Sequence, residues 1–179
     1  MKTVLQRYFY WIALFILFLL EGSLVPWILP VAWQSTIHAA PHLVLVGVLF
    51  LGVFTNRHLA LFTGLAFGFL HDIVHYGIMI GVHAFALGLC GYLAGVLTLS
   101  ARRPFVVVMT IVTVCSACFE LALYLIYHVF QVHSMSFNKA FTTIMLPSLL
   151  ITLLFSLVIY APARKLLQQF KEKSEEKGD

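Results

Sequence analysis

Two histidines four positions apart, with an acid directly after the first, make up the segment HDIVH at 71–75. In the H-E-x-x-H motif this spacing places both imidazoles on one helix face, where they bind Zn²⁺ while the glutamate acts as general base. Here the acid is Asp72, whose carboxylate is one methylene shorter, and Gly77 places His75 at a helix end. We therefore predict no catalytic residue, no metal site and no cofactor. A catalytic zinc site and a non-catalytic metal site are the alternatives.

Three acids lie within or at the edge of long apolar runs, namely Glu21, Asp72 and Glu120. Each follows a basic residue by 14 to 17 positions. That spacing is about 21–26 Å along a helix, so the acids lie at a similar depth, as does His83. An unpaired carboxylate in lipid costs at least about 2.5 kcal/mol, so such side chains face the protein interior. We expect a polar cluster near the outer membrane face. For Glu21 and Asp72, a helix cap or headgroup water is the alternative. The candidate histidines of the cluster are His71, His75 and His83.

The composition indicates a membrane protein. Of 179 residues, 61% are hydrophobic and 10% are charged, whereas soluble domains carry about 25% charged residues. We predict an all-α integral membrane protein with one transmembrane domain over 1–163 and a cytoplasmic tail over 164–179 that begins as an extension of the last helix. The net charge of +4 does not indicate nucleic-acid binding, because the basic residues lie at the ends of apolar runs.

Six membrane-spanning helices are predicted. A span needs about 20 residues, and four apolar runs have that length. The run at 41–73 is too long for one span, so we divide it near Arg57 into two shorter helices. In the last helix Pro147 predicts a kink. The predicted ranges are 8–29, 42–54, 59–73, 78–100, 104–127 and 140–161.

The distribution of positive charge supports this division. With six spans, ten of the eleven Lys and Arg residues fall on one side of the membrane and only Lys139 falls on the other. Positive charge accumulates on cytoplasmic loops, so both termini are expected in the cytoplasm. A single span over 41–73 would weaken this asymmetry.

Small residues recur on the third and fourth predicted helices at spacings of three and four. Membrane helices associate by close backbone packing at such positions, because lipid gives no hydrophobic driving force between them. We expect the two helices to form a tight hairpin or to pack against a helix of a partner. The glycines of these stripes are Gly64, Gly68, Gly77, Gly81, Gly88, Gly91 and Gly95.

The stretch from 52 to 95 resembles the rod shape-determining protein MreD family of the Gram-positive kind. The resemblance is carried by FTNRHLA at 54–60, GLAFGFLHDI at 64–73 and GVHAFALGLCGYLA at 81–94. Glu21 before a small residue, Glu120, and the segment opening the sixth helix at 136–150 agree with it. The histidines beside Asp72 are not part of the family pattern.

The resemblance implies a scaffold rather than an enzyme, in the plasma membrane of a bacterium. MreD proteins belong to the elongasome, which inserts peptidoglycan along the side wall of rods. The implied partners are an MreC-like bitopic protein, a RodA-type glycosyltransferase with its class B transpeptidase, and, indirectly, MreB filaments.

The family's fold is similar to that of the S component of energy-coupling factor transporters, and this supplies an alternative function. An S component binds a vitamin or another small molecule in an outward-facing cavity. Such proteins usually carry an Ala-x-x-x-Ala patch on their first helix, and the first predicted helix here has none. We therefore favour the scaffold.

Overall fold

The computed structural model describes residues 2–28, 42–74, 79–98, 104–132 and 135–175, and their side chains within 10–167 apart from 24–41. Two residues singled out above, His75 and Gly77, lie outside the described residues. The described part of the chain is helical and contains no strand. Its elements are α1 (Lys2–Ile28), α3 (Leu43–Phe54), α4 (Arg57–Val74), α5 (Val82–Leu97), α6 (Phe105–Val129), α7 (Phe137–Ala140), the π-helix η1 (Phe141–Met145) and α8 (Leu146–Glu175).

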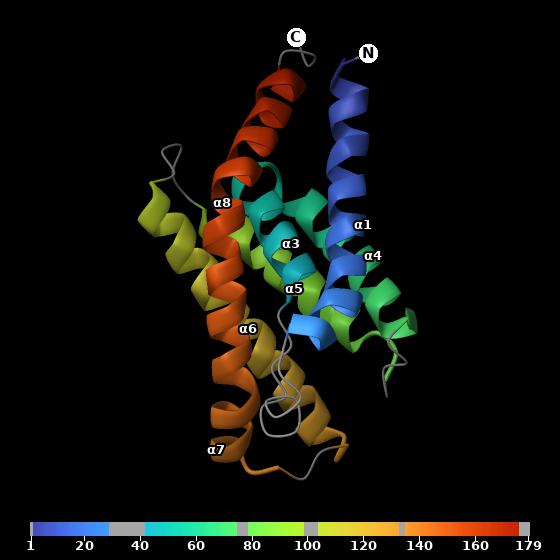
Figure 1. The fold of residues 1–179 in the computed structure, drawn as a ribbon, viewed down its shortest axis with the longest axis vertical. Helices are drawn as coiled ribbons and strands as arrows, with labels where there is room; N and C mark the ends of the chain where they lie inside the picture. The colour runs from blue at the N-terminus through green and yellow to red at the C-terminus, as the bar shows by residue number, and fades with distance from the viewer. Residues whose placement is uncertain (1, 29–41, 75–78, 99–103, 133–134, 176–179) are drawn as a thin grey trace.

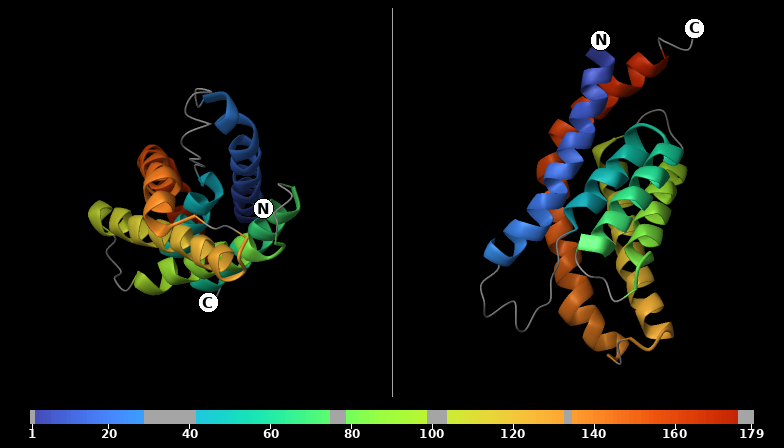
Figure 2. Two further views of the ribbon diagram at one scale, coloured as in Figure 1. Left: turned by 90° about the horizontal axis from the view of Figure 1, so that it is seen from below. Right: turned by 90° about the vertical axis from the view of Figure 1, so that its right-hand side faces the viewer.

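Helix α3 forms the centre of the fold (Figure 1). All twelve of its residues are buried, and it contacts α1, α4, α5, α6 and α8. Its sequence, LVLVGVLFLGVF, is apolar on every side, as a helix without a lipid or water face must be. Figure 2 (right) shows α1 and α8 together along one side of the other helices.

Helices α4 and α5 pack with their backbones in direct contact. A Cβ atom on Gly64 would lie 2.7 Å from the carbonyl oxygen of Leu87, and one on Gly68 would overlap the backbone of Ala84. No side chain larger than hydrogen fits at either position without moving the helices apart. The small-residue stripe of α4 therefore faces α5.

The glycines of α5 have different surroundings. Gly95 packs against Arg57 in the first turn of α4. Gly91 lies between Val48 of α3 and the backbone of Ala60 in α4. The nearest atom to a Cβ added at Gly88 belongs to the flexible side chain of Leu65, at 2.9 Å. The stripe on α5 is therefore uneven, with backbone contacts at one end and a side-chain contact in the middle.

Gly81 corrects the predicted packing stripe. It has a φ of +99° and is the N-cap of α5, and a Cβ added there would meet no atom within 4 Å. Its role is conformational, because residues with a side chain rarely adopt the left-handed region. For the same reason α5 begins at Val82, four residues after the predicted start at 78.

The last helix also differs from the prediction. Where a kink is predicted at Pro147, the structure has the π-helix η1, which ends at Met145, two residues before the proline. Proline donates no N–H and crowds the carbonyl four residues earlier, and a wider turn relieves both problems. Beyond the predicted end at 161, α8 continues through Pro162 to Glu175. The prediction that the tail begins as an extension of this helix is thus confirmed.

Two helical stretches of the described chain, Phe105–Val129 and Phe137–Leu167, are long and apolar enough to cross a membrane by themselves. Shorter apolar helices cover Tyr10–Ser23, Leu43–Phe54 and Val82–Leu97. The six-span layout therefore stays a prediction. The start of α1 and the end of α8 lie at the same end of the molecule (Figure 1).

Candidate functional site

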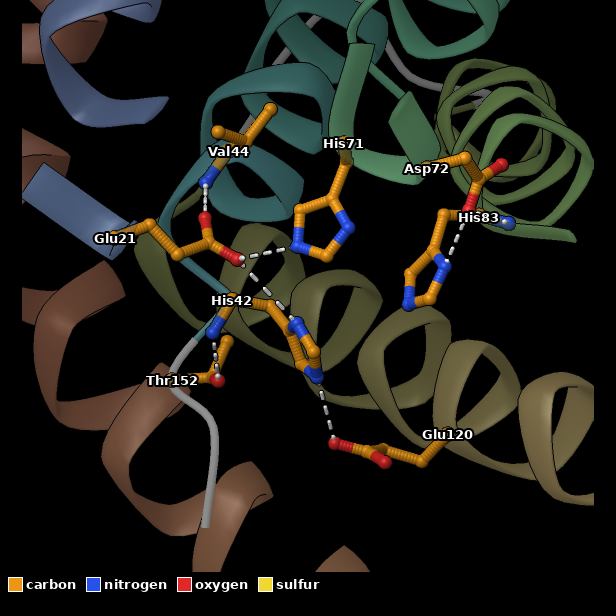
Figure 3. Close-up of polar contacts among 8 residues, drawn as sticks. All are labelled: Glu21, His42, Val44, His71, Asp72, His83, Glu120 and Thr152. Carbon is orange, nitrogen blue, oxygen red and sulfur yellow. Dashed lines mark hydrogen bonds and ion pairs between the residues drawn. The ribbon is translucent and has the colours of Figure 1, made fainter. Parts of the chain in front are cut away.

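Six ionisable side chains from five segments gather inside the fold (Figure 3). We call this set the polar cluster, and it contains Glu21, His42, His71, Asp72, His83 and Glu120. Its members come from α1, from the residue before α3, and from α4, α5 and α6. The three acids of the cluster are at most 9% exposed in their side chains, so they are shielded from lipid as well as from water.

His42 lies between two carboxylates. Its Nδ1 is 3.6 Å from Oε1 of Glu21, and its Nε2 is 3.2 Å from Oε1 of Glu120. The backbone N–H of His42 donates to Oγ1 of Thr152 at 3.3 Å, which ties the start of α3 to α8. One imidazole thus connects α1, α3 and α6.

Glu21 also caps a helix to which it does not belong. Its Oε2 accepts a hydrogen bond of 2.9 Å from the backbone N–H of Val44, in the first turn of α3. The first N–H groups of a helix have no partner within the helix, and the helix dipole favours a negative charge at this end. Since the side chain of the N-cap His42 makes no capping hydrogen bond, Glu21 performs that function.

Asp72 caps α5 in the same way. Its Oδ2 accepts from the backbone N–H of Gly81 at 2.8 Å and of Ala84 at 3.4 Å, and its Oδ1 accepts from that of His83 at 3.4 Å. The Nδ1 atom of His83 lies 2.7 Å from Oδ1. The helix-cap alternative stated for Glu21 and Asp72 is therefore what the structure contains, but in both cases the capped helix is a neighbouring one.

His71 lies between Glu21 and His83 and so connects these two members of the polar cluster. Its Nε2 lies 3.9 Å from Oε1 of Glu21, and its ring centroid lies 4.5 Å from that of His83. A cavity of about 10 Å³ is lined by these three side chains and by His42. That volume is close to the minimum for one water molecule, which could bridge groups too far apart for a direct hydrogen bond.

A metal ion would find three ligand atoms here. One atom each from His71, Asp72 and His83 lies within 4.8 Å of the others. Both oxygens of Asp72, however, already accept hydrogen bonds from the start of α5. Direct coordination would compete with the helix cap, so the arrangement suits capping better than metal binding.

A larger cavity of about 220 Å³ lies between α6 and the segment from α7 to the start of α8. His42 and Glu120 line it, so it adjoins the polar cluster. The rest of the lining consists of Leu123, Tyr124, Tyr127, His128, Met135, Ala140, Ile144, Met145 and Ser148.

The structure thus brings together Glu21, Asp72, His83 and Glu120, the four residues expected in the cluster. The sequence predicts His42 only as the first residue of the helix over 42–54, and its place in the polar cluster is a finding of the structure. A signal was present, because His42 opens the apolar run that follows the segment after Glu21. In the predicted six-span layout, the end of the first helix and the start of the second are consecutive and therefore lie at the same membrane face.

Comparisons with known proteins agree on one family. A family model described as rod shape-determining protein MreD matches residues 2–170. The rod shape-determining protein MreD of Bacillus subtilis (strain 168) is 26% identical over 140 residues, which cover 74% of this chain and 77% of that protein. No solved structure matches the chain.

Proposed function

The chain belongs to the MreD family of rod shape-determining proteins, and from this premise we propose that it is a membrane scaffold of the elongasome. Members of this family are structural components of the cell-shape machinery rather than enzymes, and they reside in the membrane. The observation that carries the proposal is the extent of the family match, which runs over nearly the whole chain.

The chemistry of the polar cluster supports a structural role. Two of its three acids cap neighbouring helices, and His42 lies between acids of two different helices. Such contacts link α1, α3, α4, α5 and α6 to one another. A scaffold needs this fixed arrangement, because its partners must find the same surface each time.

The proposed partner is an MreC-like bitopic protein, which would join the chain to a RodA-type glycosyltransferase, a class B transpeptidase and, indirectly, MreB filaments. Exposed apolar side chains on the outward faces of α1 and α8 offer a surface for lipid or for a partner's single transmembrane helix. They include Ile12, Phe15, Ile16 and Leu19 on α1, and Leu150, Leu154, Leu157 and Val158 on α8.

We further propose six membrane crossings with both termini in the cytoplasm of the bacterium. The common end shared by the start of α1 and the end of α8 supports this orientation (Figure 1). The positive charge predicted on the same side supports it as well.

Depletion of the protein in its source bacterium tests the proposal. We expect rods to become round, and we expect re-expression of the wild-type chain to restore them. Both Gly88 and Gly68 belong to the α4–α5 contact. If the Gly88→Ala variant restores rod shape and the Gly68→Leu variant does not, cell shape depends on that contact. Unchanged cell shape after depletion would contradict the scaffold function.

Co-purification tests the partners and the alternative function at once. A tagged chain solubilised in mild detergent should retain the MreC-like protein. Retention of an ATPase module instead would favour the S component of a transporter. That alternative rests on resemblance alone, because no solved structure matches the chain.

A further inference from the structure

The cavity between α6 and η1 has apolar and aromatic walls and one acidic end. Leu123, Ile144 and Met145 supply apolar surface, and Tyr124 and Tyr127 supply aromatic rings. Its volume of about 220 Å³ exceeds the roughly 150 Å³ of an engineered apolar cavity that binds benzene. The space therefore suits a ligand with one aromatic ring or a comparable apolar body and a short chain.

The acidic end is Glu120, which is only 6% exposed. Its Oε1 is buried and accepts no hydrogen bond from the described residues, although Nε2 of His42 lies 3.2 Å away. The contact with His42 is an ion pair that leaves this oxygen without a well-formed hydrogen bond, so a ligand that donates one to it gains free energy on binding.

The cationic groups near this end are few. His42 is the imidazole that contacts Glu120, and it is shared with Glu21, which His71 also approaches at 3.9 Å. His128 lines the cavity, whereas Lys139, the cation nearest in sequence to the cavity wall, does not. A positively charged ligand group would give Glu120 a counter-ion of its own, whereas a neutral or acidic one would not.

We propose that this cavity binds a small amphiphile with a primary amine, whose ammonium group contacts Glu120 and whose apolar body fills the space beside Leu123 and Met145. The ammonium donates to the carboxylate in a charge-assisted hydrogen bond. Tyr124 and Tyr127 line the same cavity and add aromatic surface for the apolar body. This site is independent of the scaffold function and would be present whether or not the chain supports cell shape.

Matched probes test the charge requirement. Phenethylamine and phenethyl alcohol share one apolar body and differ in the ammonium or hydroxyl group. The full chain is placed in phosphatidylcholine nanodiscs, because that lipid lacks a primary amine that could compete. Saturation-transfer NMR titrations should show the amine binding about tenfold more tightly than the alcohol, as expected for a hydrogen bond to a charged group.

Two Glu→Gln variants test which carboxylate recognises the ammonium group of the probe. Glu120→Gln keeps the shape of the side chain and should abolish the preference for the amine, while the alcohol continues to bind and shows that the cavity is intact. Glu172→Gln makes the same change near the far end of α8, about 36 Å from Ser148 along the helix, and should keep the preference.

A third variant tests whether the probes bind inside the cavity. Ile144→Trp adds bulk to the cavity wall and should abolish binding of both probes, which separates cavity binding from partition into lipid. Equal affinity for amine and alcohol in the wild type, saturable binding of neither, or a preference that survives Glu120→Gln would each overturn the proposal. Undiminished binding to Ile144→Trp would overturn the location.

Discussion

The carboxylate of Glu21 accepts a hydrogen bond from the backbone N–H of Val44 at 2.9 Å, so a residue of α1 caps α3. Asp72 of α4 caps α5 in the same manner. In each case the acid accepts hydrogen bonds from helix-end N–H groups that lipid could not satisfy. The same hydrogen bonds offset the free-energy cost of burying the carboxylate. Glu21 and Asp72, which the sequence predicts in a polar cluster, are thus also parts of helix–helix contacts.

Glu21→Ala should destabilise the protein by about 1 kcal/mol, the usual cost of losing a helix cap. Glu21→Gln should cost less, because its amide oxygen still accepts from Val44. Thermal unfolding in detergent micelles would measure both. Equal melting temperatures for the two variants would show that the cap contributes nothing.

Asp72→Ala should cost more than Glu21→Ala, because Asp72 accepts from three backbone N–H groups rather than one. A loss of about 2 kcal/mol or more is expected, since buried donors left unpaired cost about 1–3 kcal/mol. Asp72→Asn should recover part of the loss. Hydrogen exchange at the first turn of α5 would report the lost cap directly, and unchanged protection there would contradict it.

Gly68→Ala should destabilise the α4–α5 pair by about 1–3 kcal/mol, as overpacking commonly does. The added methyl group would overlap the backbone of Ala84, which cannot move aside alone. Gly88→Ala is the matched control, because its methyl group meets the movable side chain of Leu65. Melting temperatures should fall for the first variant and change little for the second, and the reverse order would refute the assigned contact.

His42→Leu should be strongly destabilising, by about 3–5 kcal/mol, because it removes the partner of two buried carboxylates. Addition of Glu120→Gln should restore part of the stability by removing one of those charges. A double-mutant cycle on thermal unfolding would measure the coupling. Additivity within about 0.5 kcal/mol would mean that the two side chains do not interact.

Much of the fold follows from consecutive residues. The apolar runs predicted helices, and the structure contains helices there because a chain in lipid must satisfy its backbone internally. The spacing of Gly64 and Gly68 identified the face of α4 that packs closely. Counting from basic residues predicts a similar depth for Glu21, Asp72 and Glu120, because the helix rise is constant, and the structure gathers all three in the polar cluster. These are local properties, and the sequence alone is sufficient to predict them.

The partners of each polar group were decided by the tertiary structure. Glu21 and Val44 are 23 positions apart, and His42 and Thr152 are 110 apart. No periodicity shows that His42 would lie between two acids, or that Gly81 would turn the chain into α5 rather than pack against a helix. Those relationships depend on how the helices pack around α3, which brings distant N–H groups, imidazoles and carboxylates within bonding distance.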